Sequence, residues 1–483
     1  MSITTQPRLQ FLLISALALF MLTLAACQSD LDLTGGEVDE RSDGIYYLKD
    51  EQGRSLILRG VNVSNDAKWD PLRVGSIDQG MVQRFSRDWG FNAVRMLIFW
   101  DAIEPVKGFY DTEYLDRVEE RLDWYAEEGI MVILDMHQDV YSSVFCCDGA
   151  PAWAVRDDGE PFEEQEVWWQ NYNQPAVERS FDNFWDYQGP HADLQEHYTK
   201  AWLQVISRFK DHPAILGYDL INEPHEGSAS SLTFERKVLT DFYRRLIAEI
   251  REVDHDNWIF YEPLGGLVVT GLPSGLQPIS DPRDGEPRLA YFPHLYEPSL
   301  SMGVPYLGIK TFIKAWRASR LYEMEKFQAP VLIGEFGEDE TKYGFMRYLR
   351  DMFTLTQSTT SGWFLWTYDN GTWGLLDENG HENKKLDLLV QPYPSAIAGE
   401  PLHFNYDFGN KAMTLRYRNT ADISGTTDIF IPQQRVYPGG FAVHVIPQSL
   451  QWQWDADKQQ LSIDSDQAML SDDTAIQIKI TPN

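Results

Sequence analysis

From about residue 45 to residue 366 the chain alternates between short apolar runs and longer segments with apolar residues at helical spacing. The short runs are typical of buried strands, and the longer segments predict amphipathic helices. Strands that alternate with helices favour a parallel sheet, because parallel strands need a crossover connection. The expected strands are 55–62, 91–97, 131–136, 216–221, 258–261, 289–294, 331–334 and 362–366, and the expected helices are 77–89, 114–128, 194–209, 234–253, 309–327 and 343–357. Eight such strands predict a (β/α)8 barrel, the TIM-barrel fold.

A hairpin is expected before the barrel and a long insertion within it. Residues 44–62 alternate as two arms with a turn near 50–53, and the second arm should enter the barrel as its first strand. The insertion spans residues 140–189 and is rich in aromatic residues. Loops this long in a compact domain are usually functional, so some of these rings should line a binding cleft while most form a satellite core.

The alternation with helices ends after Pro392-Tyr393-Pro394. Six strand-like runs without helices follow, at 412–418, 428–431, 442–446, 450–454, 460–463 and 475–480. They predict a small antiparallel β-sandwich. The expected domains are therefore a catalytic barrel over residues 44–394 and a C-terminal β-sandwich domain over residues 395–483. Because no exposed aromatic platform stands out in the second domain, an accessory structural role is favoured over sugar binding.

Residues 1–26 have the features of a secretory signal. Arg8 precedes an apolar run, 11–24, that is too short for a stable membrane span. The run is followed by two alanines and Cys27, which resembles a bacterial lipoprotein signal and implies that Cys27 is the lipidated first residue of the mature chain. Gln28 favours the outer membrane in that class, and residues 27–43 would form an acidic tether in the cell envelope. The alternative is an ordinary signal peptide and a secreted protein.

The charge of the chain excludes some partners. The 483 residues include 73 acidic and 41 basic side chains, a formal charge of −32, and removing the signal peptide with Arg8 leaves −33. Such a surface repels nucleic acid and anionic lipid head groups, so we expect no nucleic-acid partner. It suits a neutral substrate, although an acidic surface is also a common solubility feature.

Apart from Cys27, the chain contains two cysteines, Cys146 and Cys147, which are adjacent. In an oxidising compartment such neighbours can form a disulfide, and two reduced thiols are the alternative. The pair follows the third expected strand, so its loop can shape a site. The sequence has no metal-ligand spacing, and we expect neither a metal nor a cofactor.

Two of the expected strands end in a glutamate. Asn222 and Glu223 stand between an apolar run and Pro224, which ends the strand. Glu335 follows a second apolar run and is flanked by glycines. Catalytic residues of a parallel barrel lie at the C-terminal ends of its strands, and glycoside hydrolysis needs two carboxyl groups. A turn cap is the alternative interpretation of Asn222-Glu223, and the second glutamate in a matching setting favours catalysis.

Further polar residues at the strand ends carry a family resemblance. In chain order they are Arg95, His137, Asn222-Glu223, His294 with Tyr296, Glu335 and Trp366. With this set, residues 44–394 resemble glycoside hydrolase family 5, a group of retaining (β/α)8 enzymes. Segments 62–68, 133–139 and 392–399 resemble endoglycoceramidases and related glycosphingolipid glucosidases, a subgroup that also has a C-terminal β-sandwich. The adjacent cysteines have no counterpart in that family's motif.

The resemblance implies the roles of the catalytic residues. Glu335 would be the nucleophile, with Arg95 favouring its ionised form and Tyr296 hydrogen-bonding it. Glu223 would act first as general acid and then as base, which needs a raised pKa from burial and from the charge of Glu335. Asn222 would hold the sugar 2-hydroxyl.

The resemblance also implies how the sugar is bound. Two histidines would bind or orient sugar and carboxylate groups, an aromatic ring would stack under the cleaved sugar, and three charged side chains would bind sugar hydroxyls. These residues are His137 and His294, Trp366, and Lys68, Asp135 and Asp139.

The implied activity is release of the glycan from a glycosphingolipid by a monomeric enzyme. The same catalyst on glucosylceramide, on a steryl glucoside or on a cellulose- or mannan-type β-glucan is the alternative. A non-enzymatic glycan-binding lipoprotein fits poorly, because both glutamates and their supporting residues are present. A lipid substrate also needs an apolar surface on the aglycone side. Leu300, Met302, Val304, Tyr306 and Leu307 could supply it, or could instead pack on the barrel rim.

Overall fold

The computed structural model describes residues 45–483, apart from residues 269, 421, 465–469 and 472. The expected signal peptide, Cys27 and the acidic tether lie outside these residues. Within the part of the chain that is described, no helix is both long and apolar enough to cross a membrane.

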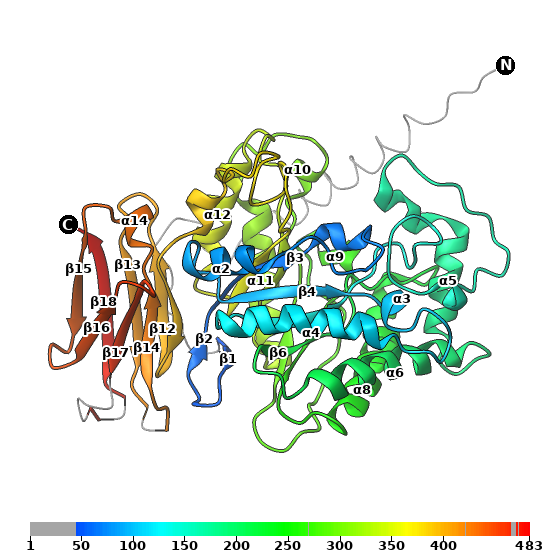
Figure 1. The fold of residues 1–483 in the computed structure, drawn as a ribbon, viewed down its shortest axis with the longest axis horizontal. Coiled ribbons are helices and arrows are strands. Elements are labelled where there is room, and N and C mark those ends of the chain that lie inside the picture. The colour runs from blue at the N-terminus through cyan, green and yellow to red at the C-terminus, as the bar shows by residue number, and fades with distance from the viewer. Residues whose placement is uncertain (1–44, 269, 421, 465–469, 472) are drawn as a thin grey trace, which may run out of the picture. The chain divides into compact units, whose positions relative to one another are not determined.

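Eight parallel strands form a closed barrel (Figure 1). Their hydrogen-bonded order is β8-β7-β6-β5-β4-β3-β10-β9, and a parallel bridge between Tyr291 and Val331 joins the two ends. The strands are β3 (Leu58–Val63), β4 (Ala93–Ile98), β5 (Met131–Met136), β6 (Ile215–Asp219), β7 (Trp258–Tyr261), β8 (Leu289–Tyr291), β9 (Ile333–Phe336) and β10 (Gly362–Leu365). This arrangement confirms the expected (β/α)8 barrel.

Large apolar side chains fill the interior of the barrel. The ring centroid of Phe292, just after β8, lies 5.0 Å from that of Phe260 on β7 and 5.4 Å from that of Phe364 on β10. These rings belong to one buried cluster with Leu58 and Ile133. A TIM barrel is a packed core and not a pore, so a substrate site must lie at the ends of the strands.

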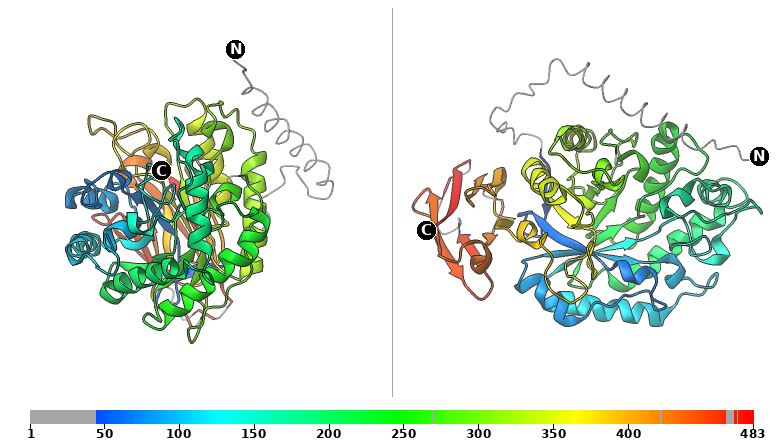
Figure 2. Two further views of the ribbon diagram at one scale, coloured as in Figure 1. Left: turned by 90° about the vertical axis from the view of Figure 1, so that its right-hand side faces the viewer. Right: turned by 90° about the horizontal axis from the view of Figure 1, so that it is seen from above.

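Amphipathic helices surround the strands (Figure 2). They are α2 (Gln79–Arg87), α4 (Thr112–Glu127), α6 (Ala192–Phe209), α8 (Thr240–Arg251), α11 (Thr311–Phe327) and α12 (Phe345–Thr356). The six expected helices are confirmed to within a few residues, except that the one expected at 234–253 begins as a π-helical segment, Phe234–Leu239. Asp78 and Asp111 start α2 and α4, because each carboxylate accepts a hydrogen bond from a main-chain N–H of the first turn.

The N-terminal hairpin belongs to a different sheet from the barrel. Its strands, β1 (Leu48–Lys49) and β2 (Ser55–Leu56), pair with each other, and β2 pairs with β11 (Tyr393–Ile397). The second arm enters the barrel only from Leu58, because residues before Ile57 bond to the C-terminal sheet. One apolar run in the sequence is therefore divided between two sheets.

Two antiparallel sheets follow the barrel, in agreement with the expected β-sandwich. One contains β1, β2, β11, β14 (Thr426–Phe430), β17 (Gln460–Asp464) and β16 (Gln451–Asp455), and the other contains β12 (Glu400–Tyr406), β13 (Met413–Arg418), β18 (Ala475–Pro482) and β15 (Phe441–Ile446). The sequence analysis missed β11 and β12. The ring of Phe430 packs against Gly90 of the barrel, where a Cβ would lie 2.2 Å from the ring. The sequence analysis expected no exposed aromatic platform in this domain. Among its described aromatic residues, Trp452 is 46% exposed.

The long insertion follows β5 and contains α5 (Pro175–Trp185). Phe181 and Phe184 are buried and contact Tyr141, whereas Trp168 and Trp169 are exposed. Most of its rings therefore form a satellite core, as expected.

Candidate active site

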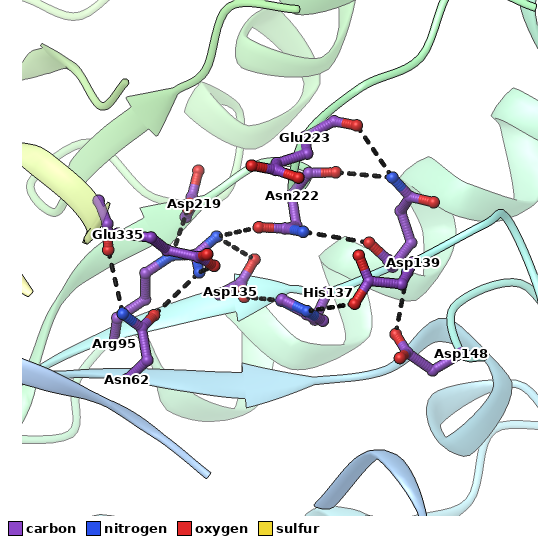
Figure 3. Close-up of polar contacts among 12 residues, drawn as sticks. Asn62, Arg95, Asp135, His137, Asp139, Asp148, Asp219, Asn222, Glu223 and Glu335 are labelled. Carbon is purple, nitrogen blue, oxygen red and sulfur yellow. Dashed lines mark hydrogen bonds and ion pairs between the residues drawn. The ribbon is translucent and has the colours of Figure 1, made fainter. Parts of the chain in front are cut away.

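The predicted site residues meet at the C-terminal ends of the barrel strands, around Arg95 (Figure 3). The guanidinium of Arg95 is fully buried and donates to Glu335 (2.7 Å), to the Asn222 side-chain oxygen (2.9 Å) and to Asp219 (2.8 Å). Five donors in a rigid fork suit one arginine to order several acceptors at once. Burial lowers the pKa of Arg95, but the surrounding carboxylates outweigh this and hold it well above its ordinary value. Arg95 is therefore a permanent cation at the centre of the site.

Glu335, at the end of β9, has the surroundings of a fixed carboxylate. Its two oxygens accept hydrogen bonds from Arg95 and from the Tyr296 hydroxyl, each within 2.8 Å. Burial raises the pKa of Glu335, and the positive charges of His294 and Arg95 oppose that rise. The expected effect of Arg95 on ionisation is thus present, but burial exceeds it.

Glu223 faces Glu335 from the end of β6. One carboxyl oxygen of each glutamate and a ring nitrogen of His294 all lie within 4.8 Å of one another. The backbone of Glu223 has a φ of 38°, a left-handed conformation that costs free energy outside glycine. Gln138 holds this turn by donating to the main-chain oxygens of Asn222 and Glu223, at 2.9 and 3.0 Å.

His294 lies between the acidic groups. Its Nδ1 is 2.8 Å from Glu223 and 3.5 Å from Glu335, and its Nε2 is 3.2 Å from Glu262. Burial lowers the pKa of His294, but the charges of Glu262 and Glu335 raise it well above the ordinary value. The ring is therefore a cation that lies against both candidate catalytic carboxyl groups.

The side chains that are expected to bind sugar lie around the rings of His137 and Trp366. Lys68 donates to Asp139, and its ammonium lies 4.3 Å from the ring centroid of Trp366. His137 stacks on Trp366 with centroids 5.4 Å apart, and its Nδ1 lies 2.6 Å from Asp135. All nine predicted substrate-binding side chains and both glutamates are thus in one region, while their individual roles stay predictions.

The sequence analysis missed four acids or amides that complete this network. Asn62 and Glu262 bond to Arg95, Asp219 does so from β6, and Asp148 bonds to the main-chain N–H of Asp139. Glu262 had a usable signal, because Glu262-Pro263 follows an apolar run as Glu223-Pro224 does. The others lie within strands or loops without such a mark.

Two groups of side chains have the composition of a metal site: His137 with Asp139 and Asp148, and Glu223 with His294 and Glu335. In the first, the Lys68 ammonium already pairs with Asp139, and nearby carboxylates raise the pKa of His137 to about 9 despite its burial. A protonated imidazole cannot ligate a metal. In the first group, the protonated ring of His137 and the Lys68 ammonium thus already neutralise the carboxylates.

Cys146 and Cys147 form a disulfide, which decides between the two states considered above. The side-chain N–H of Asn171 lies against the Cys146 sulfur, at 3.7 Å. Asp139 and Asp148 pair through their main chains, and this antiparallel bridge closes the loop that contains the disulfide.

Residues 49–372 match the sequence model of cellulase (glycosyl hydrolase family 5). The chain belongs to glycosyl hydrolase family 5. Residues 391–480 match the model of the glycoside hydrolase family 5 C-terminal domain. The solved structure of endo-glycoceramidase II from Rhodococcus sp. superposes with a TM-score of 0.84 at 39% identity, over 91% of this chain and 100% of that one.

Curated relatives of this family 5 chain agree with that likeness. Endoglycoceramidase from Hydra vulgaris is 25% identical over 83% of this chain and 82% of that protein. Glucosylceramidase from Rhizopus delemar is 28% identical, but the match covers 38% of this chain and 35% of that protein.

Proposed function

We propose that this enzyme hydrolyses the β-glycosidic bond between the glycan and the ceramide of glycosphingolipids, with retention of configuration. The observation that carries the proposal is the close approach of Glu223 and Glu335, which have carboxyl oxygens within 4.8 Å of each other. Retaining glycosidases hold their two carboxyl groups about 5–5.5 Å apart, whereas inverting enzymes need about 6.5–9.5 Å to admit a water.

The reaction proceeds in two displacements. Glu335 attacks the anomeric carbon while Glu223 gives its proton to the glycosidic oxygen, so that ceramide leaves and a glycosyl ester forms on Glu335. Glu223, now ionised, takes a proton from water, and this water cleaves the ester and regenerates both groups. Arg95 and Tyr296 each donate to one oxygen of Glu335, so they orient its carboxylate for attack through one of these oxygens.

The sugar side of the site suits a polar glycan. The Lys68 and Asp139 pair and the His137 and Asp135 pair offer charged donors and acceptors next to the Trp366 ring. Burial raises the pKa of Asp139, but Lys68 and His137 outweigh it and lower the pKa strongly. Asp139 therefore stays ionised, as a strong acceptor for sugar hydroxyls.

The aglycone side is less complete than the sequence suggested. Leu300 and Tyr306 are buried, so they anchor the loop and do not face a ligand. Met302, Val304 and Leu307 are exposed. Packing on the barrel rim thus holds for Leu300 and Tyr306, and an aglycone surface formed by Met302, Val304 and Leu307 stays a prediction.

A substrate screen tests the function. Glucosylceramide, galactosylceramide, lactosylceramide, a ganglioside and carboxymethylcellulose would be incubated with the enzyme and the products identified by mass spectrometry. We expect intact oligosaccharide and ceramide from lactosylceramide and the ganglioside. If glucosylceramide is the one substrate cleaved, the glucosidase alternative is favoured. Cleavage of carboxymethylcellulose would favour the glucanase alternative. No turnover of any substrate would favour a binding protein.

We further propose that Cys27 anchors the enzyme in the bacterial envelope through a lipid, and that it acts as a monomer. The support is the sequence around Cys27 alone: an apolar run, two alanines, a cysteine and an acidic tether.

A further inference from the structure

Exposed apolar side chains are concentrated at the catalytic end of the barrel. Eighteen large apolar residues are exposed among the described residues, and all but Tyr322, Ile446 and Trp452 lie on connections that start at the C-terminal end of a barrel strand. Scattered exposed apolar residues are normal, but a concentration on one face marks an interaction site. Most of the exposed large apolar side chains among the described residues are therefore on the connections that also carry the active site.

Four of these residues lie on the connection from β8 to α11, and Tyr343 lies beside it, where its main-chain oxygen accepts from Tyr306. Met302, Val304, Leu307, Ile309 and Tyr343, which we call the apolar rim, are 52–75% exposed. The connection itself contains His294 and Tyr296, the two site residues that follow β8. It includes the short helix α10 (Pro298–Ser301), which is labelled at the top of Figure 1.

The apolar rim is held in a fixed conformation. Leu300 and Tyr306 are buried, and the Tyr306 hydroxyl donates to Asp351 of α12 over 3.0 Å. Lys342 and Arg347 donate to the main-chain oxygens of Leu300 and Leu307, each over 2.9 Å. Two buried anchors thus turn the intervening apolar side chains outward, although burying them would have been favourable.

The charge of this segment differs from that of the whole chain. Residues 298–319 include three basic side chains and no Asp or Glu, in a protein of formal charge −32. Lys310 pairs with Asp351, whereas Arg347 spends one N–H on a main-chain oxygen, a contact that does not cancel its charge. Apolar side chains bordered by basic ones match a lipid surface, whose phosphates lie above its acyl chains.

We propose that the apolar rim docks on the surface of a lipid bilayer, so that the enzyme works on substrate that stays in the membrane. The choice of a bilayer rests on the proposed function, since ceramide would hold the substrate there. Docking at the rim places the strand ends against the layer of glycan head groups. The enzyme then moves to the bilayer, and the glycolipid is not extracted from it.

Labelling tests the docking without substrate. Ile309→Cys and Tyr343→Cys, each carrying an environment-sensitive fluorophore, would be mixed with phosphatidylcholine vesicles that contain no glycolipid. Ile446→Cys and Tyr322→Cys are matched controls, because these residues are of the same types and are similarly exposed on other parts of the molecule. We expect a blue shift and brighter emission at 309 and 343 only, whatever the state of the Cys27 anchor. No shift at 309 and 343, an equal shift at 322 and 446, or binding that needs anionic lipid and disappears in high salt would overturn the proposal.

Kinetics give the second measurement. Ile309→Ser with Tyr343→Ser should lower the turnover of vesicle-held glycolipid about tenfold and leave an aryl glycoside unaffected, because only the former requires docking. Ile446→Ser with Tyr322→Ser should change neither rate. If the wild type cleaves no glycolipid but the labels at 309 and 343 still shift, the proposed function fails and the docking surface stands. Equal loss of both activities in the rim variant would contradict docking.

Discussion

The main-chain N–H of Glu223 donates a hydrogen bond of 2.9 Å to the carboxylate of Glu262. The other oxygen of Glu262 lies 2.9 Å from Arg95 and 3.2 Å from His294. One buried acid thus bonds to the left-handed turn of the proposed acid/base, to the central cation and to the histidine between the glutamates. Glu262 is a positioning residue, since it acts on the reaction through these three groups.

Glu262→Gln should lower kcat about tenfold or more with little change in KM. The glutamine amide can still accept from Glu223, but its N–H groups would face the donors of Arg95 and His294. Loss of the Glu262 charge should also lower the pKa of His294, so the alkaline limb of the pH–rate profile should move to lower pH. Glu235→Gln, at another buried acid outside the site, is the control and should leave the profile in place. An unchanged profile in Glu262→Gln would reject this role.

The two glutamates should differ in their response to the leaving group. Glu223→Ala should nearly abolish cleavage of glycolipid but spare the first step on a dinitrophenyl glycoside, whose leaving group needs no proton. The glycosyl ester should then accumulate on Glu335 and be visible by mass spectrometry, and added azide should release it. Glu335→Gln should form no ester on either substrate. NMR of the wild-type product should show a retained anomer, and an inverted anomer would exclude the two-step reaction.

Asp148 should make stability depend on pH. Burial raises the pKa of Asp148 to about 7, Asp139 adds to the rise, and Lys68, His137 and Arg73 oppose it. The folded state therefore keeps this proton to about pH 7, while an unfolded chain loses it near pH 4. The loss of folding free energy caused by ionising Asp148 therefore grows from about pH 4 to about pH 7 and is constant at higher pH.

Asp148→Asn should accordingly raise Tm above pH 7 and change it little near pH 4, as measured by calorimetry. Asp254→Asn is a control of opposite sign, because hydrogen bonds lower the pKa of Asp254 in spite of its burial. That variant should be less stable than the wild type at neutral pH. A higher Tm for Asp148→Asn at pH 4 and pH 8 alike would show that ionisation is not the cause.

The length of the aglycone should affect the specificity constant. Each buried methylene contributes roughly 0.8 kcal/mol, so kcat/KM should rise with acyl length on short-chain glycolipids kept below their micelle threshold. Soluble cello-oligosaccharides of increasing length are the comparison, and they should show no such rise. A flat response to acyl length together with good turnover of a soluble β-glucan would favour the glucanase alternative.

Cys27→Ser should release the enzyme from the membrane fraction without altering hydrolysis of a soluble aryl glycoside. The reason is that the proposed lipid is attached ahead of an acidic tether, away from the barrel sequence. Incorporation of labelled palmitate into the wild type, and not into the variant, would be measured in a bacterial host. A wild-type chain that takes up no label would end the lipoprotein hypothesis.

The sequence by itself determined the barrel and the main site residues. Strand and helix periodicity are local properties, and the eight strands and six helices follow from them. Asn222-Glu223, His294 and Glu335 could be found for the same reason, because each stands at or just beyond the end of an apolar run. Arg95 is instead a single charged residue within an apolar run.

Tertiary structure decided what depends on distant parts of the chain. Glu262 and Asp219 are functional candidates only through their contacts with Arg95, which is far away in sequence. The division of residues 55–62 between two sheets depends on pairing with β11, which lies more than 300 residues later. In the loop after β8, the sequence shows apolar residues throughout, and only tertiary packing, such as that of Tyr306 against α12, separates the buried anchors Leu300 and Tyr306 from the exposed rim. Periodicity cannot encode such choices, because they are set by which partner surface is available once the barrel has closed.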